Sequence, residues 1–155
     1  MGTRHRQAVI NKVGELKIQQ YGQWDGYPDG QGKDILAYLI NGNLDKYQEE
    51  LDKINLITKE QDEEVEADAE WEINYPYMSR DCGSSIHKMI EDGNVKFVAH
   101  IEEEEAKKWC DGFYTIDFQK GLFITEYGDK RVELRLDSLP TEEEYIEMFV
   151  EEDED

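Results

Sequence analysis

The stretch that decides the fold is residues 113–136, FYTIDFQKGLFITEYGDKRVELRL. Apolar and polar side chains alternate along three short runs, which are separated by Gln119-Lys120-Gly121 and Gly128-Asp129-Lys130. Alternation with a period of two is typical of half-buried strands, and short connections containing glycine join antiparallel neighbours. The sequence therefore predicts a three-stranded antiparallel meander with one face in water.

Other strands are expected before the meander. Residues 5–10 and 15–21 are short β-type runs joined by a hairpin turn at residues 11–14. A further run at 95–101 alternates in the same way, and we expect it to pair with the meander.

Four segments predict helices. The first begins near Asp34, and Asn43 can cap a second helix that carries one apolar stripe. A third begins at Ser79 or Asp81, and the last begins at a capping box of Thr141 with Glu144. The chain is therefore predicted to be α+β: an antiparallel β-sheet, made of the N-terminal hairpin and the C-terminal meander, packed against several α-helices.

Length and charge set the domain organisation. The 155 residues fit a single α+β domain, 1–155, with a formal net charge of −21. Most of this charge comes from eight carboxylates in residues 60–72 and nine in residues 141–155, two tracts without a base. Because residues 58–74 lack apolar periodicity, we expect an acidic linker or insertion there, and a frayed acidic tail at 151–155.

The charge also limits the partners. A strongly negative chain repels nucleic acid and anionic membranes and attracts basic protein surfaces, so we expect neither direct nucleic-acid binding nor membrane binding. Alternatively, the acidic tracts only keep the protein in solution. Cys82 and Cys110 make no disulfide framework, and the first residues lack a signal peptide, so we expect the bacterial cytoplasm as the location.

Residues 21–32, YGQWDGYPDGQG, place three aromatic rings among four glycines and are called the aromatic–glycine loop below. Glycine and proline at this density exclude a regular strand or helix. The loop either folds back as a lid over the core or presents its rings to a partner, since Tyr and Trp make strong contacts at low entropic cost. Its candidate partner-binding residues are Tyr21, Gln23, Trp24, Asp25 and Tyr27.

A second candidate contact lies in the acidic tract. Its carboxylates could imitate a nucleic-acid backbone in a basic channel of the partner. The candidate residues are Glu63, Glu64, Glu66 and Asp68.

Catalytic motifs do not fit. A phosphate loop needs glycine where Tyr27 stands and Ser or Thr where Asp34 stands. Removal of Met1 exposes Gly2 rather than Thr3, so an N-terminal nucleophile is not favoured. The histidines and cysteines lack the close spacing of a zinc site. We therefore expect no catalytic residues, no metal and no cofactor.

The opening Gly2-Thr3-Arg4-His5, together with the aromatic–glycine loop, resembles a family of small phage and prophage proteins without an established activity. Residues 79–83 and 113–118 resemble the same family, so the likeness covers most of the chain. The resemblance implies a phage context, and small acidic proteins from that context look like inhibitors of host defence, including type II anti-CRISPR proteins.

The sequence and the resemblance lead to one functional hypothesis and one alternative. The hypothesis is a non-enzymatic inhibitor that binds a basic bacterial defence nuclease, of which a Cas9-type nuclease is one example, and blocks it by protein–protein contact. The alternative is a small hydrolase or nucleotide-handling enzyme centred on the aromatic–glycine loop. It would require a preorganised pocket containing Thr3, His5, Asp25 and Lys33.

Overall fold

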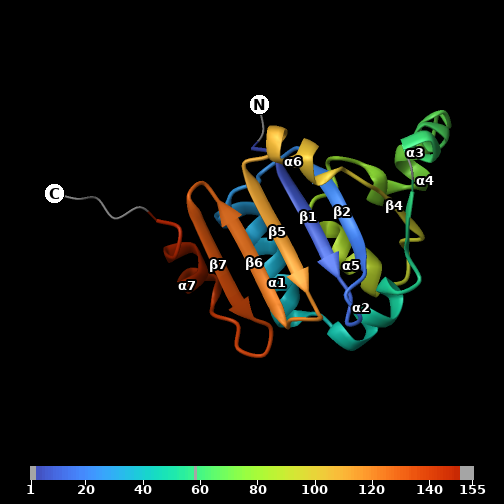
Figure 1. Cartoon of the computed structure of the whole chain (residues 1–155). Coiled ribbons are helices and arrows are strands. Elements are labelled where there is room, and N and C mark those ends of the chain that lie inside the picture. Colours follow the sequence, from blue (N-terminus) through green and yellow to red (C-terminus); the bar gives the residue numbers. More distant parts are fainter. Residues whose placement is uncertain (1–2, 58, 151–155) are drawn as a thin grey trace.

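Five strands form the main sheet in the computed structural model, which describes residues 3–57 and 59–150. The strands are β1 (His5–Ile10), β2 (Leu16–Gly22), β5 (Gly112–Asp117), β6 (Leu122–Tyr127) and β7 (Lys130–Arg135). Their order across the sheet is β2-β1-β5-β6-β7 (Figure 1). The hairpin, the meander and the α+β class predicted from the sequence are confirmed.

The hairpin and the meander are joined by a parallel pair of strands. β1 pairs with β5 in parallel over its whole length, with Ala8 opposite Thr115, while the other neighbours are antiparallel. A parallel pair needs a long crossover connection. Here the connection is residues 11–111, which includes β2 and then, in residues 23–111, most of the helices.

The helices, apart from two short turns, are α1 (Lys33–Asn41), α2 (Leu44–Leu51), α3 (Lys59–Glu66), α4 (Trp71–Asn74), α5 (Ser85–Glu91), α6 (Glu103–Trp109) and α7 (Glu142–Glu147). The turns are η1 (Pro28–Gly32) and η2 (Pro76–Met78). α1, α2 and α5 lie behind the sheet in Figure 1, where their apolar side chains form the core with those of the strands. Burial of that shared apolar surface is the main force that holds the two layers together.

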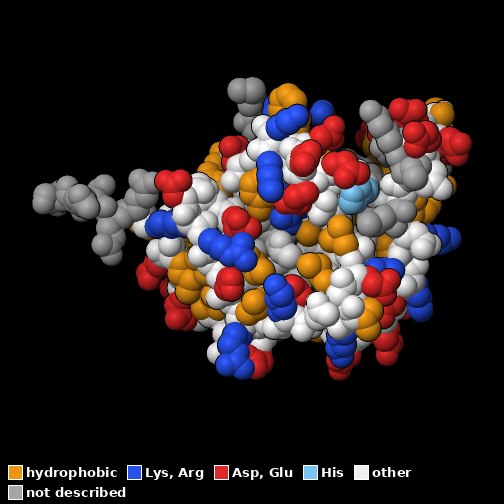
Figure 2. Space-filling model, viewed as in Figure 1, with side chains coloured by type: hydrophobic (Ala, Val, Ile, Leu, Met, Phe, Trp, Pro, Cys, Tyr) orange, Lys and Arg blue, Asp and Glu red, His pale blue; other side chains and the backbone are white. Residues whose placement is uncertain are grey.

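The other face of the sheet is open over most of its area, and α6 packs against β1 at one end of it, where Glu103 of α6 pairs with the buried Arg6 of β1 at 3.3 Å (Figure 1). Figure 2 shows charged side chains interspersed with hydrophobic ones on this face. Arg131 on β7, for example, forms ion pairs with Glu126 and Glu133 at 3.0 and 3.3 Å. This is the pattern of an antiparallel sheet with one face in water.

Two predicted helix caps are confirmed. The Asn43 side chain accepts a hydrogen bond from the Lys46 backbone N–H at 3.1 Å and begins α2. At α7 the Thr141 hydroxyl accepts from the Glu144 N–H, and the Glu144 carboxylate accepts from the Thr141 N–H, both at 3.2 Å. Each cap satisfies backbone donors that the first helical turn leaves unpaired.

The predicted partner of the strand near residue 97 was wrong. β4 (Phe97–Ala99) is only three residues long and pairs in parallel with β3 (Asn55–Ile57) in a separate two-stranded sheet. The edge of the meander at β5 is already taken by β1. The chain after β4 only crosses the outer edge of β2, where the Ile101 N–H donates to the Gln19 carbonyl at 2.9 Å.

The start of the third predicted helix was also wrong. α5 begins at Ser85 instead of Ser79 or Asp81. Gly83 has a φ of +54°, a left-handed conformation that a right-handed helix does not contain, so the chain turns before the helix starts.

Two short helices, α3 and α4, occupy the described part of the acidic tract, where the sequence predicted a linker or insertion. They project from one edge of the molecule, on the side opposite α7 (Figure 1). Trp71, at the start of α4, packs against the core. Thr58 and the predicted frayed tail, residues 151–155, lie outside the described residues.

Candidate functional site

The aromatic–glycine loop lies over the end of the sheet at which β1 and β5 begin. The Gly26 N–H donates to the Thr3 carbonyl at 2.9 Å, just before β1. The Gly26 carbonyl accepts from the Tyr114 hydroxyl of β5 at 2.6 Å. Both backbone groups at the centre of the loop are therefore satisfied by the sheet, which holds the loop in one position.

Glycine is required where the loop touches β1. A Cβ added to Gly22 would overlap the His5 ring, and one added to Gly26 would lie 2.7 Å from the Thr3 carbonyl oxygen. The inner side of the loop therefore acts as the lid considered from the sequence. It covers His5, whose side chain has no exposed surface.

A second attachment joins the loop to the turn before α5, about fifty residues further along the chain. The Gln23 N–H donates to the Arg80 carbonyl at 3.0 Å, and the Trp24 indole N–H donates to the Asp81 carboxylate. Gln31 accepts from the Ser84 N–H at 2.8 Å through its side-chain oxygen. Residues 21–32 and the turn at residues 79–84 are thus held side by side by these hydrogen bonds.

Asp25 adopts a left-handed backbone conformation, with φ at +54°. Its carbonyl accepts a hydrogen bond from the Gln31 N–H at 2.8 Å, which closes the loop on itself. Among residues with a side chain, Asp and Asn adopt this conformation most readily. The strained position turns the chain between the two exposed rings, and such positions concentrate at functional sites.

The outer side of the loop presents its rings to solvent. Trp24 is 45 % exposed and Tyr27 is 43 % exposed, which is high for side chains of this size. The half-buried Tyr21 donates its hydroxyl hydrogen to the Gln23 side chain. The loop therefore combines both roles considered from the sequence: a lid on its inner side and exposed rings on its outer side.

The structure brings together the five candidate residues of the loop and leaves the acidic candidates apart from them. Glu63, Glu64 and Glu66 lie exposed on α3, and Asp68 lies exposed in the turn that follows. These elements project from the edge of the molecule (Figure 1). The aromatic rings and the acidic residues are thus two separate candidate contacts.

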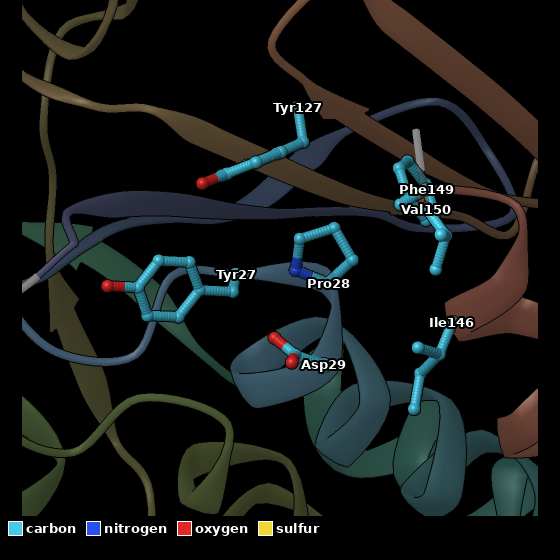
Figure 3. A pocket seen from close by; sticks show the side chains of 7 residues that line it. All are labelled: Tyr27, Pro28, Asp29, Tyr127, Ile146, Phe149 and Val150. Atoms are coloured by element: carbon cyan, nitrogen blue, oxygen red, sulfur yellow. The ribbon is translucent and has the colours of Figure 1, made fainter. Parts of the chain in front are cut away.

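A hollow of about 170 Å³ lies between the loop and α7, and we call it the α7 hollow (Figure 3). It is lined by Tyr27, Pro28, Asp29, Tyr127, Ile146, Phe149 and Val150. Of these residues, only Tyr27 was predicted from the sequence as a candidate for partner binding. Pro28 and Asp29 belong to the same loop, whereas Tyr127, Ile146, Phe149 and Val150 come from distant segments, for which the repeated apolar positions of the last helix were the only local signal.

Polar side chains are buried in the core beneath the loop. Nε2 of His87 donates to the Gln7 side-chain oxygen at 2.7 Å, and Nδ1 accepts from the Tyr47 hydroxyl at 2.9 Å. Both ring nitrogens of His5 lack a hydrogen-bond partner among the described residues. Burial lowers the pKa of His5 to about 4, and burial with the nearby His5 lowers the pKa of His87 to about 3.

The buried histidines are poorly placed for chemistry on a substrate, because a general base must reach the proton that it removes. His5 is sealed under the loop, while Asp25 is exposed on the outer side. The α7 hollow is lined by none of the four residues that the enzyme alternative needs, Thr3, His5, Asp25 and Lys33. His5 is therefore closed to a substrate, and the α7 hollow does not supply the preorganised pocket that the enzyme alternative requires.

Two further features concern metal ions and membranes. Within residues 3–57 and 59–150, no three or more His, Cys, Asp or Glu side chains are grouped so that they could hold a metal ion. In the same part of the chain, no helix is long and apolar enough to cross a membrane.

Comparison with known proteins gives no relative. No protein-family model, no curated protein and no solved structure matches the chain.

Proposed function

We propose that this chain is a non-enzymatic binding protein that attaches to a basic bacterial protein through the aromatic–glycine loop and blocks its action. The single observation that carries the proposal is that Trp24 and Tyr27 are half-exposed on a loop whose backbone is fixed from two sides. Rings that are already ordered lose little entropy when they are buried by a partner, so they can contribute most of the binding energy.

The charge of the chain supports a basic partner. A net charge of −21 attracts basic surfaces over a distance set by the ionic strength and speeds encounter with them. The exposed carboxylates of Glu63, Glu64, Glu66 and Asp68 add to this attraction. In the proposal they steer the approach, and the loop holds the complex.

The proposed target is a defence nuclease in the cytoplasm of the bacterial host. Nucleases of this kind hold DNA or RNA in channels lined with Lys and Arg, which is the surface that an acidic binding protein would meet. The resemblance to phage proteins supports this class, and a Cas9-type nuclease is one member of it. No direct contact of the chain with nucleic acid is part of the proposal.

The loop is the preferred main contact because of the size of α3. This helix has eight residues, and its one apolar side chain is the half-buried Val65. Isolated helices shorter than ~12–15 residues are only marginally stable in water. A contact made by α3 alone would therefore lose part of its energy in ordering the helix, whereas the loop is already anchored to the sheet.

A capture experiment tests the proposal. The tagged chain, its Trp24→Ala/Tyr27→Ala variant and a variant with the four carboxylates neutralised are used as baits in a bacterial lysate at low and moderate salt. We expect the wild-type bait to retain a basic nuclease and to inhibit its cleavage in a purified assay, and we expect the loop variant to lose both properties. Equal retention and inhibition by a correctly folded loop variant would contradict the proposal.

A further inference from the structure

The α7 hollow has an apolar floor and a polar rim. Ile146, Phe149 and Val150 lie on the α7 side, Pro28 lies in the middle, and Tyr27 and Tyr127 lie on the other side (Figure 3). The rings of Tyr27 and Tyr127 meet edge to face, with their centroids 6.3 Å apart. An amphipathic guest with an apolar stem and a polar head would match this arrangement.

The charge at the rim is negative. Asp29 is exposed, and the residues that line the hollow include no base. Burial raises the pKa of Tyr127, and the negative charges of Asp111 and Asp29, with Tyr27, raise it further. A basic residue at the far end, Lys130, donates instead to the carbonyls of Met148 and Val150 at 3.3 and 3.2 Å.

The apolar floor, the tyrosine rings and the negative rim determine which kind of side chain fits the hollow. A cation is attracted to the face of a tyrosine ring and to a carboxylate, while four methylene groups of a lysine stem can cover an apolar floor. A purely apolar side chain would remove water from Asp29 and two hydroxyls without replacing their hydrogen bonds. An acidic side chain would be repelled by Asp29 and Asp111.

We propose that the α7 hollow binds a lysine or arginine side chain of the partner protein. The stem packs on Pro28 and Phe149, and the charged head lies beside Asp29 and the rings of Tyr27 and Tyr127. This inference rests on the proposed function for the identity of the partner. It adds that a lysine or arginine side chain of that partner occupies the α7 hollow of this chain.

Two small probes test the hollow without the partner. Nα-acetyl-lysine methylamide and Nα-acetyl-norleucine methylamide differ mainly in an ammonium group at the end of the stem. Each is titrated into the isotopically labelled full chain by NMR, at physiological ionic strength so that the net charge is screened beyond ~8 Å. We expect saturable shifts at Tyr27, Tyr127 and Ile146 with the lysine probe, and binding of the norleucine probe weaker by about threefold or more.

A pair of matched variants separates the site from the overall charge. Asp29→Asn removes a carboxylate at the rim, and Asp34→Asn removes an exposed carboxylate of α1 that does not line the hollow. Asp29→Asn should weaken the lysine probe by roughly threefold or more, and Asp34→Asn should leave it nearly unchanged. Equal effects of the two variants, equal binding of both probes, or no shift at the hollow would each overturn the inference.

The probe titration and the capture experiment can fail independently of each other. If the capture experiment identifies a nuclease whose binding depends on Trp24 but the lysine probe does not bind, the hollow inference is wrong and the proposed function stands. If the probe binds as expected and no partner is inhibited, the hollow is supported and the proposed function is wrong.

Discussion

His5 and His87 are ionisable residues placed in the core as neutral groups. Their burial lowers both pKa values well below the ordinary value near 6.5, and Gln7 and Tyr47 hold His87 through its two ring nitrogens. In the unfolded chain both rings would take up a proton below about pH 6.5. The folded chain does not take it up until the pH approaches 4 for His5 and 3 for His87.

This difference predicts a loss of stability in acid. Below about pH 6.5 the unfolded state binds more protons than the folded state, so each histidine lowers the free energy of unfolding by about 1.4 kcal/mol per pH unit until its folded pKa is reached. Urea unfolding of the wild type and of His87→Gln, at about pH 7.5 and about pH 5, measures the contribution of His87.

The variant should lose less stability than the wild type over this interval, by about 2 kcal/mol. The comparison cancels the general effect of charge, because both proteins keep the same carboxylates. Parallel losses in the two proteins would show that His87 is not kept neutral by the fold.

At the scale of single elements, the Thr141 capping box is the clearest local determinant. Thr141→Ala removes the hydroxyl that accepts from the Glu144 N–H and should lower the free energy of unfolding by about 1 kcal/mol. Thr141→Ser keeps the acceptor and is the matched control, which should retain most of the stability. Urea unfolding of the wild type and the two variants measures the free energy of unfolding. An equal decrease in both variants would contradict the role of the cap.

The elements that could be predicted from the sequence are those set by neighbouring residues. Asn43 caps α2 as expected, and the turns at 119–121 and 128–130 join the meander strands. Alternation at residues 95–101 predicted a strand correctly but gave it the wrong partner, because β1 occupies the edge of the meander at β5 and the strand pairs with β3 instead. Local patterns contain no information about that competition.

In the candidate site, too, the local features could be predicted from the sequence and the contacts between distant segments could not. Composition alone predicted the loop and its rings. Clustered glycines exclude a regular strand or helix, and aromatic rings outside such elements are candidates for contact with a partner. The hydrogen bond from Trp24 to Asp81 and the contact of Tyr27 with Tyr127 join segments 57 and 100 residues apart in sequence, and no spacing predicts them. The acidic helix α3 was likewise missed, because it has almost no apolar stripe.

For the molecule as a whole, the central feature is the separation of rings and charges. The loop is fixed to the sheet and to the turn before α5, while α3 and α4 project from one edge (Figure 1). If the rings hold the complex and the carboxylates steer it, the two sets of residues should act on different rate constants. Charge affects mainly association, and buried anchors affect mainly dissociation.

The most direct test measures association and dissociation rates with the captured partner at low and physiological salt. Trp24→Ala/Tyr27→Ala should raise the dissociation rate roughly 30-fold, the equivalent of about 2 kcal/mol, at both salt concentrations. Neutralising Glu63, Glu64, Glu66 and Asp68 to Gln or Asn should slow association at low salt and leave affinity at physiological salt within about threefold. A large, salt-dependent loss of affinity from the carboxylate variant, with little effect of the ring variant, would contradict the account.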